Sequence, residues 1–194
     1  MSAIGKFIFM NLTFLLLQVN LNCNAQFHER IYFNNLYNQN TMSVGKSILE
    51  SDSSYIIAGG GLDSIFGYKN IIIAKISLDG ELISWNEYRT NLSDHYAGFP
   101  GSIHAFNGSF ILGGSHNVQN ESCGLYMNFD SSFDSYTYNS YCSKVGPVLY
   151  FRYCNIINQH DLIFTGYDRH PDMIGKVLLL KSDSSGNEKW RTSY

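Results

Sequence analysis

The chain has 194 residues, a length that favours one domain or two small ones. Charged residues make up only 15% of it, whereas Asn and Ser occur 19 and 23 times. This neutral composition argues against coiled coils, helical bundles and acidic disorder. With 13 Lys and Arg against 16 Asp and Glu, the net charge is −3, so a surface that neutralises nucleic-acid phosphates is not expected.

Residues 1–25 have the features of a secretory signal peptide. Lys6 supplies a positive charge, residues 7–19 are largely apolar, and Ala25 is the small residue that precedes the cut. The apolar stretch is short for a membrane span, and no other segment is apolar enough, so no span is expected in the mature chain. We therefore expect a secreted or outer-membrane-surface protein. Lipidation of Cys23 is the alternative, although Asn22 stands where a small residue is expected.

Cleavage would leave Cys123, Cys142 and Cys154. An odd number in an exported protein allows one internal disulfide and one remaining thiol. Cys142 could pair with either of the other two, and the sequence does not choose between them. There is no C-x-x-C pair and no His/Cys cluster at zinc spacing, so no metal site is expected.

The mature sequence repeats itself with a period of 53 residues. Gly60, Gly113 and Gly166 each close an apolar run, and an aromatic residue follows later in each unit, at Trp85, Tyr138 and Trp190. Further sets of three residues are also spaced by 53 positions along the chain. They are Ile72, Leu125 and Leu178; Ser77, Asp130 and Asp183; and Gly80, Phe133 and Gly186.

Each unit is predicted to form four short strands, because runs rich in Ile, Tyr and Phe alternate with turn residues. In the first unit these are residues 44–50, 55–60, 70–77 and 82–89. The turns between strands are predicted at Asp79-Gly80, at Asn107-Gly108, and at Ser184-Ser185-Gly186, since Gly takes the positive φ that a hairpin needs. Asp79, Asp130 and Asp183 are interpreted as turn residues and not as calcium ligands.

The expected fold class is all-β and propeller-like, because strands such as 71–74 and 177–180 are apolar on both faces and must be covered on both sides. We expect three four-stranded blades, at residues 43–97, 98–146 and 147–194. Residues 26–42 would be the outer strand of a preceding or closing blade. Propellers have about four to eight blades, so the ring is expected to be incomplete. Its partners would be the remaining blades of a larger protein or another copy.

Residues 161–166 and 178–190, which include Asp183, Gly186 and Trp190, resemble the blade repeat of secreted propellers common in Bacteroidota. The resemblance covers the mature chain and implies blade architecture, without implying an activity. The second unit departs from the pattern, since Phe133 stands in place of Gly. The pairs Gly59-Gly60 and Gly113-Gly114 are also similar to kelch blades.

Any binding surface is expected on the loops between second and third strands, at residues 61–69, 115–123 and 167–175, because recognition usually sits on loops of a rigid scaffold. The candidate residues are Phe66, Tyr68, His116, Asn117, Tyr167, Arg169 and His170. No catalytic motif, phosphate-binding loop or cofactor motif is present.

The sequence therefore predicts a secreted or surface propeller module that binds a glycan or a protein. One alternative is a propeller-type hydrolase or lyase acting on glycans, which would need converging carboxylates. A structural fragment of a larger secreted protein is the other alternative.

Overall fold

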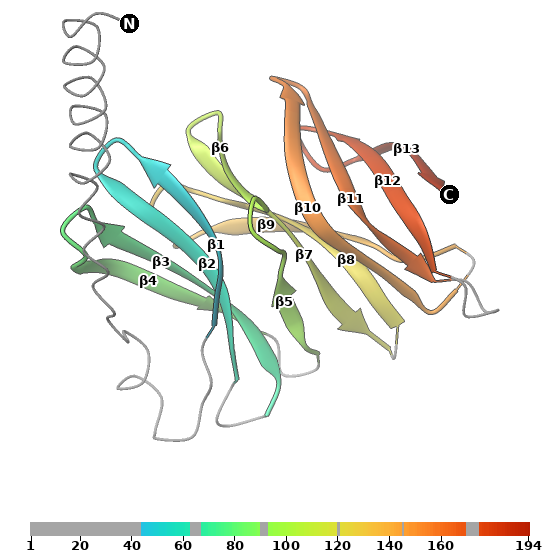
Figure 1. Ribbon diagram of the computed structural model, residues 1–194, viewed down its shortest axis with the longest axis horizontal. Coiled ribbons are helices and arrows are strands. Elements are labelled where there is room, and N and C mark those ends of the chain that lie inside the picture. Colours follow the sequence, from blue (N-terminus) through green and yellow to red (C-terminus); the bar gives the residue numbers. More distant parts are fainter. Residues whose placement is uncertain (1–43, 63–66, 90–92, 120, 145, 170–174) are drawn as a thin grey trace, which may run out of the picture. The chain divides into compact units, whose positions relative to one another are not determined.

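The computed structural model describes residues 44–62, 67–89, 93–119, 121–144, 146–169 and 175–194. The predicted signal peptide and the strand predicted at residues 26–42 lie outside them. The described residues form thirteen strands and no helix (Figure 1), which confirms the all-β class. None of them belongs to a helix that could cross a membrane.

Three four-stranded antiparallel meanders follow one another along the chain. The first is β1 (Val44–Ser51), β2 (Ser54–Leu62), β3 (Lys69–Ser77) and β4 (Leu82–Tyr88). The second is β6 (Ile103–Phe106), β7 (Ser109–Val118), β8 (Glu121–Phe129) and β9 (Tyr136–Tyr141). The third is β10 (Val148–Asn158), β11 (Asp161–Arg169), β12 (Gly175–Asp183) and β13 (Glu188–Ser193).

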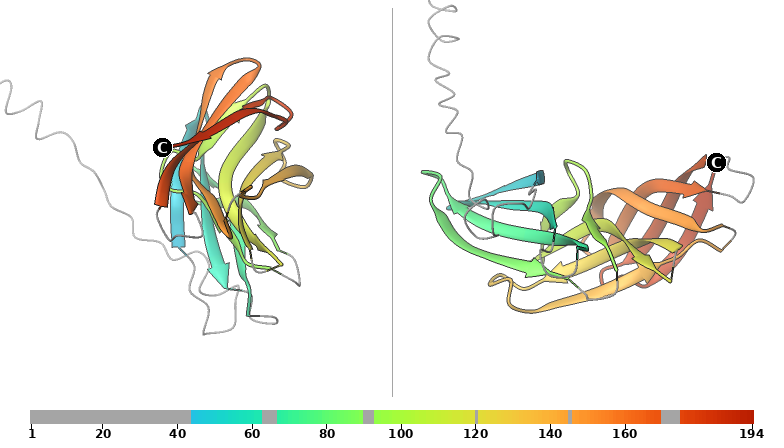
Figure 2. Two further views of the ribbon diagram at one scale, coloured as in Figure 1. Left: turned by 90° about the vertical axis from the view of Figure 1, so that its right-hand side faces the viewer. Right: turned by 90° about the horizontal axis from the view of Figure 1, so that it is seen from below.

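The second and third meanders belong to one nine-stranded sheet, whereas the first is a sheet of its own. The second and third meanders are joined by a single parallel bridge between Val148 and Ser122. The short strand β5 (His95–Ala97) pairs with β7 and completes this sheet. Figure 2 shows the same strands from two further sides.

The four strands predicted for the first unit are confirmed to within two residues at each end. The predicted turn at Asn107-Gly108 is also confirmed, and both of its residues have positive φ, 50° and 76°. The loop predicted at residues 115–123 is wrong, because β7 continues to Val118 and β8 begins at Glu121. Polar residues in this segment resemble a loop, but they alternate with buried ones along two paired strands.

The turn between third and fourth strands has the same backbone in all three meanders. Gly80, Phe133 and Gly186 have φ values of 84°, 66° and 81°. In each turn their backbone N–H donates to the carbonyl three residues earlier, at 2.9, 3.2 and 3.0 Å. These three equivalent positions of the repeat thus share one backbone conformation with positive φ, even where Phe replaces Gly.

Apolar side chains are buried between successive meanders in two clusters. The first joins the β1–β4 sheet to the second meander and includes Ile56, Ile73 and Met127. The second joins the second and third meanders and includes Tyr126 and Phe164. Burial between sheets explains why these strands lack the apolar-polar alternation of strands with one solvent face.

Candidate ligand-binding groove

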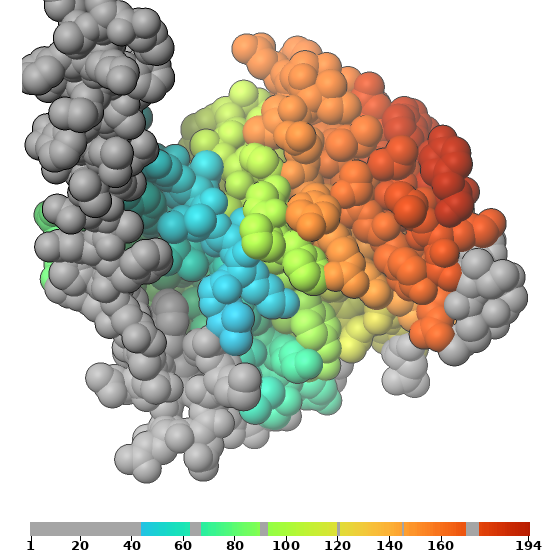
Figure 3. Space-filling model, in the orientation of Figure 1, coloured from blue at the N-terminus to red at the C-terminus, as the bar shows by residue number. Residues whose placement is uncertain are grey.

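A groove lies beside β1, β5 and β10. One hollow of about 290 Å³ is lined by residues of β1, β5 and β10, and another of about 450 Å³ by residues of β1, β2, β3 and β5. Lys46 and Tyr96 line both, so we treat the two as one groove. In Figure 3, β1 (cyan), the β5–β6 region (yellow-green) and β10 (orange) are neighbours on one face. We call this the cationic groove, defined by Lys46, Lys69, Tyr96, Phe99, Tyr150 and Arg152.

Equivalent positions of the three units converge in the cationic groove. Lys46, Phe99 and Arg152 are separated by steps of 53 residues and all line it. One hydrogen bond joins two of these positions, since Phe99 donates its backbone N–H to the Arg152 carbonyl at 2.8 Å. The Lys46 ammonium donates to the carbonyl of Ala97, two residues before Phe99, at 3.4 Å. Equivalent positions of the repeat thus form one part of the groove.

Three cationic side chains face this groove without a carboxylate partner. Among the described residues, Lys46, Lys69 and Arg152 form no ion pair. Burial lowers the pKa of Lys46, and the positive charges of Lys69 and Arg152 lower it further. Asp94, an acid beside the groove, accepts hydrogen bonds from the Tyr96 hydroxyl and the Lys69 backbone N–H. The groove thus holds positive charge that a bound anion would offset.

Aromatic rings lie beneath these charges. The Lys69 ammonium is 5.0 Å from the centre of the Tyr96 ring, and the Arg152 guanidinium is 4.4 Å from that of Phe99 and 5.3 Å from that of Tyr150. These distances are in the range of cation–π contacts. Phe99 nevertheless leaves 42% of its surface exposed. The arrangement offers flat apolar faces beside charged donors.

The described residues that were predicted as rim ligands lie in different environments. Phe66 and His170 lie outside the described residues, and Tyr68 is exposed. Of the rest, Asn117 lines the cationic groove, and the Tyr167 ring stacks on Tyr150, a groove residue, with centroids 5.4 Å apart.

Of the other two rim residues, His116 is buried and Arg169 is half-buried. His116 is 5% exposed and pairs across β5 and β7 with His95. The Arg169 Nε is buried and has no hydrogen-bond partner among the described residues.

His116 is a buried neutral histidine. Burial lowers its pKa to about 4, with a further contribution from His95, whose own pKa is lowered mainly by burial. Its Nε2 is within hydrogen-bond distance of the Ser140 hydroxyl. A Ser–His pair alone does not make a hydrolase, because the base needs a group to orient it. Among the described residues no carboxylate bonds to His116.

Asp130 and Asp183 have the role in turns that the sequence predicted for them. The Asp130 carboxylate accepts backbone N–H bonds from Ser132, Asp134 and Ser135, and the Asp183 carboxylate accepts two within its own turn. Burial alone would raise the pKa of Asp130, but the hydrogen bond from the Ser132 hydroxyl, together with backbone N–H bonds including those from Asp134 and Ser135, lowers it.

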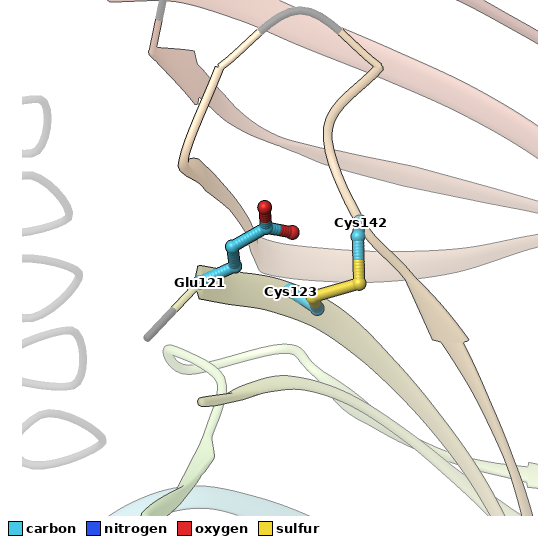
Figure 4. A group of neighbouring side chains, drawn as sticks. All are labelled: Glu121, Cys123 and Cys142. Carbon is cyan, nitrogen blue, oxygen red and sulfur yellow. A yellow bond between two sulfur atoms is a disulfide. The ribbon is translucent and has the colours of Figure 1, made fainter. Parts of the chain in front are cut away.

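The disulfide joins Cys123 to Cys142, which resolves the alternative that the sequence left open. Cys154 is buried and forms no disulfide, and burial raises the pKa of its thiol. Figure 4 shows Glu121 beside the disulfide. These three residues do not form a metal site, because both sulfur atoms are bonded to each other and neither is a thiolate.

Sequence reasoning missed the groove because it considered loops, whereas most groove residues lie on strands of different meanders. Lys46, Phe99 and Arg152 share one position of the 53-residue repeat, but they are three different residue types, so this position does not stand out in the sequence. No Asp or Glu is among the described residues that line the groove. Compared with known proteins, the chain matches no family model and no curated protein.

Proposed function

We propose that this protein is a secreted or cell-surface binding module of propeller type, and that the cationic groove binds an acidic glycan. The observation that carries the proposal is the convergence of Lys46, Lys69 and Arg152, without carboxylate partners among the described residues, over aromatic rings.

The ligand class follows from the two kinds of surface in the groove. An arginine binds a carboxylate or sulfate through paired N–H donors, and a lysine adds a point charge. Aromatic faces such as Phe99 and Tyr96 pack against the apolar faces of sugar rings. A glycan with a carboxylate or sulfate on successive sugars satisfies both requirements.

The propeller architecture is supported by three successive four-stranded meanders with a common turn and by the resemblance of the third unit to secreted propeller blades. In such an arrangement the first strands face the centre, where Lys46, Phe99 and Arg152 would lie together. The predicted signal peptide supports a location outside the cell.

The glycan-active hydrolase or lyase is less well supported. Glycoside hydrolysis ordinarily requires two carboxylates that flank the scissile bond, and the described lining of the groove has none. We therefore develop the binding function and not the enzymatic one.

A glycan array with the intact protein tests the proposal. We expect retention of uronic-acid or sulfated oligosaccharides and no retention of neutral glucans of the same length. Binding should weaken as NaCl is raised from 50 mM to 500 mM, because salt screens exposed charges. Equal retention of acidic and neutral glycans, or retention of none, would reject an acidic glycan as the ligand.

A further inference from the structure

Successive meanders are held together by a contact between a tyrosine and a turn. On β4, the Tyr88 hydroxyl donates to the Phe133 carbonyl oxygen at 2.7 Å, and the Asn86 side-chain amide donates to the same oxygen at 2.8 Å. Phe133 lies in the turn between β8 and β9. The contact buries both groups, since Tyr88 is 3% exposed and Phe133 is 1% exposed.

The same contact recurs one repeat later. On β9, the Tyr141 hydroxyl donates to the Gly186 carbonyl oxygen, and the Asn139 amide donates to the Ser185 carbonyl at 2.9 Å. Asn139, Tyr141 and Gly186 each follow their counterparts in the first contact by 53 residues. The contact is therefore a property of the repeat, made of a tyrosine-bearing face and a turn with positive φ.

The third meander carries the tyrosine-bearing face, but this face is exposed. Tyr194 follows Tyr141 by 53 residues, and its backbone pairs with Val177 through two hydrogen bonds of 3.0 Å. Tyr194 is 74% exposed and Val177 is 60% exposed, whereas Tyr141 is 4% exposed. In Figure 1, β13, which precedes Tyr194, is the edge strand of its sheet. We call Val177, Tyr194 and the half-buried Leu179 the Tyr194 face.

The first meander carries the other half of the contact. Gly80 has a φ of 84°, like the two turns that make contacts, but it is only partly buried. No side chain of the described residues donates to its carbonyl oxygen. The neighbouring Leu78 leaves 51% of its surface exposed. Among the described residues, the Tyr194 face therefore occurs without a facing turn, and the Gly80 turn occurs without a facing tyrosine.

We propose that the Tyr194 face of one chain binds the Gly80 turn of a second copy of this chain. The Tyr194 hydroxyl donates to the Gly80 carbonyl, and the apolar side chains of the Tyr194 face pack around Leu78, as Tyr126, the counterpart of Leu179, packs on the turn at Ser184 and Gly186. The proposed interface continues an existing one, since the chain already makes this contact twice. A contact between different surfaces repeats until the assembly closes, and two copies close if each turn meets the other copy's face. The proposal does not depend on the ligand of the cationic groove.

Sedimentation velocity of the purified protein over a concentration series tests the proposal. We expect reversible self-association. Val177→Lys should raise the dissociation constant at least about tenfold, because it places a charge in an apolar contact. Leu78→Lys should weaken it comparably. Tyr194→Phe, which removes only a hydroxyl, should weaken it about fivefold, as expected for one hydrogen bond. Val118→Lys, at an exposed valine of the second meander, is the matched control and should have no effect.

The two interface variants also test the pairing of unlike halves. A mixture of Val177→Lys and Leu78→Lys retains one intact face and one intact turn, so it should associate more strongly than either variant alone. Far-ultraviolet circular dichroism checks that each variant is folded. A wild-type protein that stays monomeric at every concentration overturns the proposal. An association that Val177→Lys abolishes but Leu78→Lys leaves intact also overturns it, since the face would then bind something other than the turn.

Discussion

Phe133 has the same left-handed backbone conformation as Gly186, although its side chain is among the largest in the protein. This conformation costs an L-residue about 1–2 kcal/mol relative to Gly. The Phe133 ring is 1% exposed and packs 5.2 Å from the ring of Phe110, so burial of the ring offsets the cost. The second unit has thus replaced the glycine of the repeat with a core residue.

The turn glycines should respond differently to an added methyl group. Gly80→Ala should lower the free energy of unfolding by about 1 kcal/mol, because it imposes positive φ on alanine. Gly186→Ala should cost more, because its Cβ would lie 2.6 Å from the Tyr126 ring and 2.4 Å from the Asn139 amide. Asp79→Asn should change little. Urea unfolding measures all three, and equal values would contradict the assigned turn.

The tyrosines of the repeated contact should also differ. Tyr141→Phe should destabilise the fold by about 1–2 kcal/mol, because no other side chain of the described residues donates to the buried Gly186 carbonyl. Tyr88→Phe should cost less, since Asn86 still donates to Phe133. Tyr153→Phe, at an exposed tyrosine, is the control for loss of a hydroxyl. Equilibrium unfolding in urea ranks the variants, and the reverse order would count against this description of the contacts.

Much of the fold could be predicted because its signals are local. The 53-residue period, the Ile-rich runs and the turn glycines located the strands of the first unit and the turns at Asn107-Gly108 and Gly186. The pairing of Cys123 with Cys142 could not be predicted, since it depends on how β8 and β9 align. The joining of the second and third meanders into one sheet rests on a single bridge at Val148, which no sequence pattern indicates.

Loss of the disulfide should destabilise the fold substantially. A Cys123→Ser/Cys142→Ser double variant should lose about 2–4 kcal/mol of unfolding free energy, the usual effect of a bond that closes a loop of 19 residues. Reductant should bring the wild type to the same value and leave the variant unchanged. Peptide mapping that finds Cys142 joined to Cys154 would contradict the pairing.

Stability should fall as the pH drops from about 6.5 to 4. The unfolded chain takes up a proton on His116 near pH 6.5, whereas the folded chain resists protonation until about pH 4, so acid favours the unfolded state in this window. The loss should reach about 2–3 kcal/mol. His116→Gln should flatten the profile, and His160→Gln, at an exposed histidine, should not. Urea unfolding at several pH values measures this, and parallel profiles for all three proteins would disprove the assignment.

The groove could not be predicted because it depends on the tertiary arrangement of the strands. A cationic site requires side chains from β1, β3 and β10 to meet, and the sequence shows only their separate positions. Asn117, the one predicted ligand residue among the described residues that lines the groove, was chosen as part of a loop but lies on β7. His116 was chosen beside it, and strand alternation turned it inward.

The most direct test of the proposed function is calorimetric titration with an oligogalacturonate, a chain of carboxylate-bearing sugars. Arg152→Gln should weaken binding at least about tenfold, because it removes a paired donor to a carboxylate. Lys144→Gln removes the same charge from an exposed site outside the groove and should change the affinity less than about twofold. Equal losses in the two variants, or unchanged binding in Arg152→Gln, would contradict the cationic groove as the ligand site.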